Sequence, residues 1–363
     1  MDKSKWKKAS QTVEGNTIKK FCCYILAIAI GCSFTHRVDS ASAQEPLYYK
    51  GKTVRFIVAY SAGGSFDTIT RAITRHIGKH IPGNPKTTVE NMTGAGGIIA
   101  ANYLFNKTKP DGLTIGNWIG SLVFQQIFGK KSIEFDARRF EWVGVPAVDH
   151  PVCALTEASG VTKLDKWLSS KKSIKIGGIG PGGTASDVPR ILKAALGLPI
   201  KVIDGYKGPA KIGLAAKAGE IAGGCWGWRS IKVTWRKGIE SGKVHPVLQV
   251  NPKRHPDLQK VPNAIELAKT DRARQLIKVG IHDQAALTRL YSLPPGTPKE
   301  RVKILQKAFV DTMSDPEFLA ETKNFNLEIK PKSGEEVKEI VDGFFKMDTA
   351  VLSRLKEIIV YKR

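Results

Sequence analysis

The chain has 363 residues, of which 42% are hydrophobic and 25% charged, a composition typical of globular proteins that excludes a largely disordered chain. The length suffices for two domains, each with its own core. The formal net charge of +24 favours anionic partners. Nucleic acid is not the expected partner, because the basic residues after position 44 are dispersed and form no long run interleaved with aromatic residues.

Residues 1–43 have the three parts of a secretory signal peptide. A basic, polar lead (1–20) precedes an apolar run (21–34), which is shorter than the roughly 20 residues of a membrane span. Ala41-Ser42-Ala43 then gives a small-residue cleavage pattern. We therefore expect a periplasmic protein that begins at Gln44. A buried N-terminal helix and a lipoprotein signal at Cys32 are the alternatives. Residues 1–43 hold seven Lys and Arg and three Asp and Glu, so the remainder keeps a charge of +20.

The rest of the chain alternates strand-like and helix-like segments, which predicts an α/β fold with largely parallel strands and helices on the sheet faces. Helices are expected after Asp67, near Ile98 and after Gly183, and a capping box at Ser333 and Glu336 starts another. Thr297 followed by Pro298 predicts a further helix start. The expected strands are 54–60, 87–90, 113–118, 140–145, 173–177, 200–204, 220–228 and 244–250.

The first candidate site is the loop from Tyr60 to Asp67, where a strand ends, glycines follow and a helix begins. Such a loop brings backbone N–H groups and the positive end of a helix dipole to an anion. Asp67 is expected to be the N-cap. A second loop with exposed amides follows the next strand, so the two should lie side by side at the carboxyl ends of adjacent strands. The alternative is that these glycines only make tight turns. The candidate residues are Tyr60, Ala62, Gly63, Gly64, Ser65, Phe66, Asp67, Ala95, Gly96 and Gly97.

The segment Gly178–Gly183 fits the pattern G-x-G-x-x-G, and Asp204 stands where a ribose-binding acid is expected. An NAD(P)-dependent oxidoreductase is therefore the alternative function. Export from the cytoplasm and a proline inside the turn count against it. Thr184 and Ser186, at the start of the next helix, suit hydrogen bonding to a carboxylate equally well.

Other side chains have structural readings beside the functional ones. His76 and His80 are spaced i, i+4, but no glutamate follows His76, so we expect surface histidines and no metal site. Trp226 and Trp228 end a buried strand and either wall a ligand cleft or pack in the core. A disulfide between Cys153 and Cys225 is allowed by the expected compartment, but sequence alone does not establish its geometry.

Five motifs in one order resemble the substrate-binding proteins of tripartite tricarboxylate transporters. VAYSAGGSFD at 58–67 resembles the first glycine loop of that family, and VEN at 89–91 with GAGG at 94–97 resembles the second. KPDG at 109–112, YKG at 206–208 and GEI at 219–221 are similar to three further family motifs. The resemblance covers most of the chain after residue 43.

The resemblance implies a two-lobed α/β periplasmic-binding-protein fold (type II-like), each lobe a mixed sheet flanked by helices. Lobe 1 would span 44–147 plus 286–363, and lobe 2 would span 148–285. The receptor would be a monomer without catalytic residues or cofactor, which closes on a small organic acid and docks onto a large and a small integral-membrane subunit.

In this reading, backbone N–H groups of 62–67 and 95–97 bind the proximal carboxylate, and Asp67 shapes its loop. Lobe 2 would add Thr184, Ser186 and Tyr206, with Trp226 or Trp228 as a wall. The sequence departs from the family where Asp187 follows Thr184-Ala185-Ser186, because the family often has a histidine in this region. Asp187 near the cleft is expected to reject a carboxylate on that side or to pair with an amine. The bound acid and a dedicated permease stay undetermined.

Overall fold

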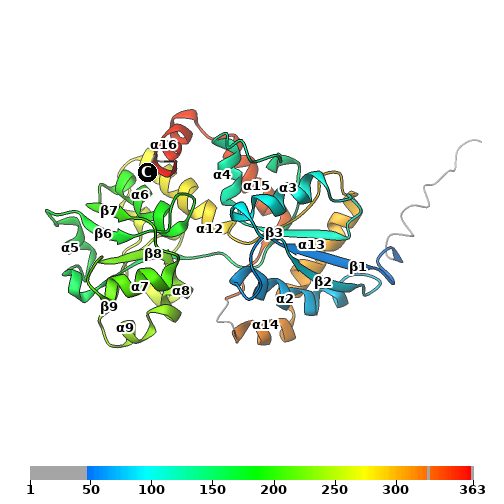
Figure 1. Ribbon diagram of the computed structural model, residues 1–363, viewed down its shortest axis with the longest axis horizontal. Helices are drawn as coiled ribbons and strands as arrows, with labels where there is room; N and C mark the ends of the chain where they lie inside the picture. The colour runs from blue at the N-terminus through cyan, green and yellow to red at the C-terminus, as the bar shows by residue number, and fades with distance from the viewer. Residues whose placement is uncertain (1–46, 325–327, 361–363) are drawn as a thin grey trace, which may run out of the picture. The chain divides into compact units, whose positions relative to one another are not determined.

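The computed structural model describes residues 47–324 and 328–360, so the predicted signal peptide lies outside the described residues. Within these ranges the strands form two sheets, one of six strands in the order β11-β4-β10-β3-β1-β2 and one of five in the order β7-β6-β8-β5-β9 (Figure 1). Each sheet is mixed, as predicted. Over the same ranges, no helix has the length and apolar character needed to cross a membrane.

The first sheet places the carboxyl ends of its parallel strands together. β2, β1 and β3 run parallel, whereas β10 runs antiparallel between β3 and β4. β11 adds a short antiparallel edge to β4. The strands are β1 (Thr53–Val58), β2 (Lys86–Asn91), β3 (Thr114–Trp118), β4 (Glu141–Val145), β10 (Leu290–Leu293) and β11 (Lys332–Ser333).

Helices cover both faces of the first sheet (Figure 1). Their apolar stripes face the strands; in α2, for example, Ile69, Ala72, Ile73 and Ile77 are buried, which is the predicted stripe. One face carries α2 (Ser65–Ile77), α13 (Lys299–Ser314) and α14 (Pro316–Lys323). The other carries α3 (Ile98–Asn106), α4 (Ser121–Ile127) and α15 (Gly334–Phe345).

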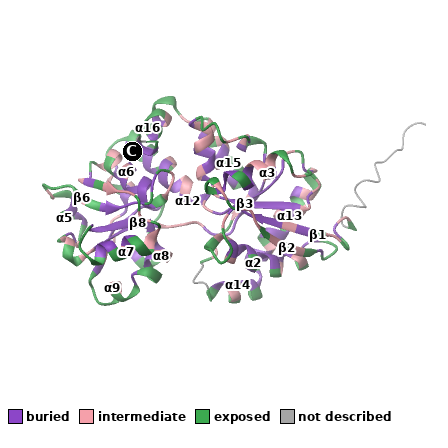
Figure 2. Ribbon diagram, in the orientation of Figure 1, coloured by how far each residue is buried: buried purple, intermediate pink, exposed green. Residues whose placement is uncertain are grey.

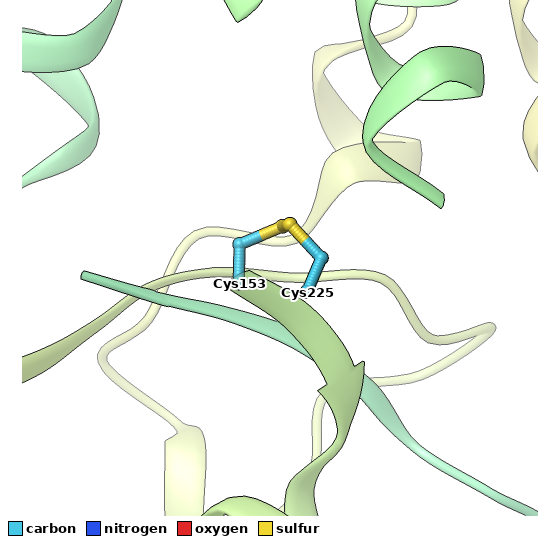
Figure 3. The surroundings of a disulfide bond; sticks show 2 residues. All are labelled: Cys153 and Cys225. Atoms are coloured by element: carbon cyan, nitrogen blue, oxygen red, sulfur yellow. A yellow bond between two sulfur atoms is a disulfide. The ribbon is translucent and has the colours of Figure 1, made fainter. Parts of the chain in front are cut away.

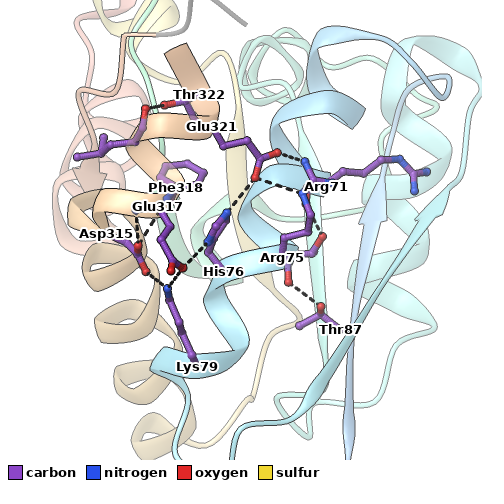
Figure 4. A network of polar contacts seen from close by, with 12 residues as sticks. Arg71, Arg75, His76, Lys79, Thr87, Asp315, Glu317, Phe318, Glu321 and Thr322 are labelled. Carbon is purple, nitrogen blue, oxygen red and sulfur yellow. Dashed lines mark hydrogen bonds and ion pairs between the residues drawn. The ribbon is translucent and has the colours of Figure 1, made fainter. Parts of the chain in front are cut away.

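His76 of α2 and His80 of the following 3-10 segment η2 (Gly78–His80) both contact α14, and Figure 4 shows the contacts of His76. Nε2 of His76 lies 2.9 Å from a carboxylate oxygen of Glu321, which also pairs with Arg75. Nε2 of His80 lies 2.8 Å from Asp315, the N-cap of α14. Hydrogen bonds from its neighbours outweigh burial and lower the pKa of Asp315, with Lys79 the largest contributor. Both histidines therefore serve an interhelical polar contact.

The second sheet is built around β5, which runs antiparallel to both β8 and β9. β7, β6 and β8 are parallel. Cys153 of β5 lies directly opposite Cys225 of β8, and the two form a disulfide (Figure 3). The strands are β5 (Pro151–Thr156), β6 (Ile174–Gly177), β7 (Ile200–Ile203), β8 (Gly223–Gly227) and β9 (Val244–Gln249).

Helices also flank the second sheet on two sides (Figure 1). On one side α6 (Thr184–Leu196) packs against α11 (Asp271–Ile277) and α16 (Thr349–Ile359). On the other, α7 (Pro209–Lys217) and α8 (Trp228–Thr234) pack near α9 (Arg236–Glu240). A π-helical segment, η7 (Lys278–Asp283), follows α11 and leads into α12 (Gln284–Ala286). The short helices α5 (Leu164–Leu168) and α10 (Ala264–Leu267) complete the set in the described ranges.

Buried residues follow the strands and the inner faces of the helices, whereas exposed residues gather on loops and outer faces (Figure 2). An aromatic cluster of Trp118, Phe135, Phe140 and Trp142, with ring centroids 5.3 to 5.7 Å apart, fills the core beside β3 and β4. Ring pairs at such separations add to the free energy gained from burial alone.

Two predicted helix starts differ from the observed ones. Thr297 was the expected N-cap of α13, but the helix begins at Lys299 with Pro298 as its N-cap, and the hydroxyl of Thr297 donates to the carbonyl of Pro294. α2 begins at Ser65 with Gly64 as its N-cap, so the prediction that Asp67 is the N-cap is wrong. The capping box of Ser333 and Glu336 is confirmed.

Candidate functional site

The carboxylate of one buried residue, Asp67, holds the loop between β1 and α2 in place. Asp67 is 2% exposed, and its Oδ2 accepts a hydrogen bond from the backbone N–H of Gly63 at 2.8 Å. Nε of Arg71 and Nδ2 of Asn91 donate to the same carboxylate. Burial would raise the pKa of Asp67, but these hydrogen bonds outweigh burial and lower it. Asp67 therefore shapes the loop, as predicted, and its acceptors are already engaged.

The exposed side of this loop presents the start of α2. Residues 61–65 are exposed, and the N–H groups of Ser65 and Phe66 lie in the first turn, where a helix has no internal acceptors for them. The helix has 13 residues, and its dipole favours negative charge at this end. The side chain of Phe66 packs on Tyr60, with ring centroids 4.2 Å apart.

The second glycine loop lies against the first, as predicted from the order of the strands. β1 and β2 pair in parallel, and the hydroxyl of Tyr60 donates to the carbonyl of Gly96 at 3.1 Å. Burial raises the pKa of Tyr60, so this hydroxyl stays protonated at neutral pH. The residues Gly94 to Gly97 all have positive φ, including Ala95 at 48°. A non-glycine residue in this region is strained, and such strain concentrates at functional sites.

Arg289, which was not among the residues predicted for the site, lies beside these loops. Arg289 is 6% exposed, and its guanidinium carbon lies 5.6 Å from the centre of the Phe66 ring. Its Nη1 lies 3.2 Å from Oδ1 of Asp149. Arg229 is close to the same pair: burial first, and then the charge of Arg289, lower the pKa of Arg229, while Asp149 acts in the opposite direction. The sequence feature that could have indicated Arg289 is that a single arginine stands within the largely apolar run Ala285–Leu290.

A cavity of about 470 Å³ lies next to this group. Asp149 and Thr288 line it, together with Ser121 and Gln125 of α4 and residues of η7. Of the predicted site residues, Thr184 and Asp187 line the cavity. Its apolar wall consists of Ile119, Phe124, Phe128, Val188, Ile281, Ile359 and Val360.

Asp187 lies at the start of α6, where burial changes its charge state. It is 9% exposed, and one carboxyl oxygen accepts from the N–H of Gly182 at 3.2 Å. Burial raises the pKa of Asp187 to about 8, although the Gly182 N–H and the charge of Arg190 act in the opposite direction. Burial therefore favours the protonated form of this carboxyl group. The expectation that Asp187 rejects a carboxylate or pairs with an amine stays a prediction.

Ser186 and Asp204 are both engaged within the protein. The hydroxyl of Ser186 donates to Oδ1 of Asp204 at 2.6 Å and accepts from the N–H of Gly180 at 2.8 Å. Nη2 of Arg190 lies 2.7 Å from Oδ2 of Asp204. Because both carboxylate oxygens of Asp204 are engaged, this loop gives no support to the oxidoreductase alternative. Ser186 anchors the loop and is fully buried, so it does not face the cavity.

The tryptophans belong to the core of the second sheet. Trp226 is 3% exposed and packs on Trp235, with ring centroids 5.0 Å apart. Trp228 is 5% exposed, and its indole N–H donates to Asp257 at 3.0 Å. Neither ring lines the cavity, so the structure favours the core-packing reading over the ligand wall. Tyr206 is half-buried and packs against the same core.

Two groups of described residues have the composition of metal ligands: His150 with His255 and Glu328, and His76 with Asp315 and Glu317. In each group a lysine already pairs with the carboxylates. Nζ of Lys330 lies 2.7 Å from Glu328, and Nζ of Lys79 lies 2.7 Å from Asp315. A carboxylate in each group therefore already has a cationic partner within the protein.

Most of the chain matches one protein family. Residues 69–356 match the family described as the tripartite tricarboxylate transporter family receptor. The chain belongs to this family. Its members are binding receptors, not a class of enzymes. The matched segment includes the second glycine loop, Asp187 and Arg289.

Individual relatives match this chain over most of their own length. A protein encoded in the tcbD-tcbE intergenic region of Pseudomonas sp. (strain P51) is 23% identical, over 93% of this chain and 94% of that protein. The crystal structure of a TctC solute-binding protein from Polaromonas has a TM-score of 0.67 at 19% identity, over 86% of this chain and 99% of that one. An R. palustris protein solved with adipate has a TM-score of 0.59 at 20% identity, over 85% and 96% of the two chains. These structures share the fold of two mixed sheets flanked by helices.

Proposed function

We propose that this protein is an extracytoplasmic receptor that captures a small organic carboxylate and delivers it to a transporter in the membrane. The observation that carries the proposal is the pair of adjacent glycine loops, whose exposed backbone lies beside the buried guanidinium of Arg289. Backbone N–H groups at a helix start together with an arginine suit a carboxylate. The R. palustris structure with adipate, which has the same fold, supports this ligand class.

The two sheets would act as the two lobes of the receptor. We propose lobe 1 at 44–147 plus 286–363 and lobe 2 at 148–285, which places each sheet in one lobe. Helix α16 packs on α6, so the end of the chain would connect the lobes. A ligand that contacts both lobes would favour the closed state by its differential affinity. The closed monomer would then dock onto the large and small membrane subunits after export through the N-terminal segment.

A thermal-shift screen tests the ligand class. We expect at least one of succinate, adipate and citrate to raise the melting temperature of the purified protein, because a ligand that binds only the folded state stabilises it by mass action. At 100 times the dissociation constant the gain is about 2.7 kcal/mol. NAD and NADP, which the Gly178–Gly183 loop would hold in the alternative function, should produce no shift. A shift with NAD and none with any carboxylate would refute the proposal.

A further inference from the structure

We propose that Arg289 binds the ligand carboxylate directly and that Asp149 holds this guanidinium in place until the ligand replaces it. The inference rests on the proposed function and deepens it, because it adds a charged, specificity-determining residue to a site otherwise formed by backbone amides. Nη1 of Arg289 lies 3.2 Å from Oδ1 of Asp149.

Arg289 has a hydrogen-bond donor that the described part of the protein does not engage. A guanidinium offers five N–H donors, and a buried one requires partners for them. The buried Nε of Arg289 has no hydrogen-bond partner among the described residues. A carboxylate engages an arginine through two parallel N–H···O bonds, and one that replaced Asp149 would use Nη1 and Nη2 of Arg289.

Arg289 lies close to both the first glycine loop and the wall of the cavity. Its guanidinium lies over the ring of Phe66, and the backbone N–H of Phe66 lies in the first turn of α2, where a helix offers no internal acceptor. Asp149, its partner, lines the 470 Å³ cavity, and Thr288 next to Arg289 in the chain lines it too. Arg289 itself does not line the cavity, but it contacts Phe66 of the first glycine loop on one side and Asp149 of the cavity wall on the other.

The buried charges around Arg289 also favour an anionic ligand. Two guanidinium groups, Arg229 and Arg289, lie near one carboxylate, Asp149, and the charge of Arg289 is one of the causes that lower the pKa of Arg229. Removing charges from water costs free energy unless they are balanced. A ligand carboxylate beside Arg289 would bring a further negative charge to this buried group. Asp149 is 28% exposed, whereas Arg289 is 7% exposed at its side chain, so Asp149 is the member of the pair that can turn toward water.

The test is a double-mutant cycle between the receptor and the ligand. The dissociation constants of adipate and of its neutral analogue adipamide are measured by calorimetry for the unmodified protein and for Arg289→Gln. If Arg289 touches the carboxylate, Arg289→Gln weakens adipate binding at least about 30-fold and changes adipamide binding by less than about threefold. Equal weakening of acid and amide would mean that Arg289 acts only through the fold, and would overturn the proposal.

Three further variants make the result specific. Arg289→Lys keeps the charge but loses the planar two-bond geometry, so its adipate affinity should lie between those of the unmodified protein and Arg289→Gln. Asp149→Asn removes the internal competitor and should tighten adipate binding; weaker binding would contradict the exchange. Arg254→Gln, which breaks an exposed pair with Glu266, serves as the matched control and should leave affinity unchanged.

Failure of this inference is distinguishable from failure of the proposed function. If the unmodified protein binds adipate, succinate or citrate and the cycle shows no coupling to Arg289, the protein is still a carboxylate receptor and the role of Arg289 is refuted. If it binds none of the three at millimolar concentration, the proposed function itself is refuted. Circular dichroism of each variant confirms that the comparison is between folded proteins.

Discussion

Replacing both cysteines of the second sheet, Cys153→Ala with Cys225→Ala, is expected to lower the free energy of unfolding by about 4 kcal/mol. The disulfide closes a loop of 72 residues, and loop closure removes conformational entropy from the unfolded chain. Both side chains are fully buried in the centre of the sheet, so the native state offers no easy relaxation around the missing sulfurs. The effect is a large fraction of the stability of an ordinary domain.

Urea unfolding of the double variant, followed by circular dichroism, measures this loss. Unmodified protein that is unfolded, reduced and refolded in the presence of a thiol reductant is the matched control, and its transition should fall close to that of the double variant. The position of the bond between adjacent strands (Figure 3) leaves β5 and β8 paired by hydrogen bonds in either state. A double variant that unfolds at the same urea concentration as the oxidised protein would contradict the account.

Replacing Asp187 with asparagine is expected to stabilise the protein, and by more at higher pH. Burial raises the pKa of Asp187 to about 8, whereas an unfolded chain has an ordinary aspartate pKa near ~3.9. Between these values the folded state holds a proton that the unfolded state has released, so stability falls as pH rises through this window. The slope is at most about 1.4 kcal/mol per pH unit. Asparagine keeps an acceptor for the Gly182 N–H and lacks the titration.

Unfolding free energies at pH 5, 6.5 and 8 measure this dependence for both proteins. The advantage of Asp187→Asn should grow steadily from pH 5 to pH 8 and level off above about pH 8. Asp271→Asn, an acid in the first turn of α11 with a side chain 94% exposed, is the matched control and should show no comparable trend. A pH-independent difference between Asp187→Asn and the unmodified protein would show that the carboxyl group titrates normally.

The regular part of the fold was predictable from the sequence because its signals are local. A strand, a glycine loop and an amphipathic helix follow one another at β1 and α2, and the same order recurs at β6 and α6. The contact between the two glycine loops also followed from the sequence, since loops after neighbouring parallel strands meet at one edge of a sheet. The capping box at Ser333 depends on four residues and was predicted correctly.

What the sequence did not provide depends on contacts between distant residues. β10 was missed because it is only four residues long and directly follows Arg289, and its place between β3 and β4 is set by pairing across more than 140 residues. Trp226 and Cys225 are neighbours in β8, so their side chains lie on opposite faces of the sheet. The sequence does not tell which of the two faces meets a ligand. The pairing of Cys153 with Cys225 depends on strand register, and the protonation of Asp187 on burial; neither is written in the local sequence.

Whether one small organic acid binds each receptor is measured most directly by native mass spectrometry of the purified protein, before and after addition of succinate, adipate or citrate. The account predicts a complex of one chain with one acid, and a marked loss of that complex in Arg289→Gln. A spectrum that shows only the bare chain with every acid at millimolar concentration would contradict the claim that the paired glycine loops form a carboxylate site.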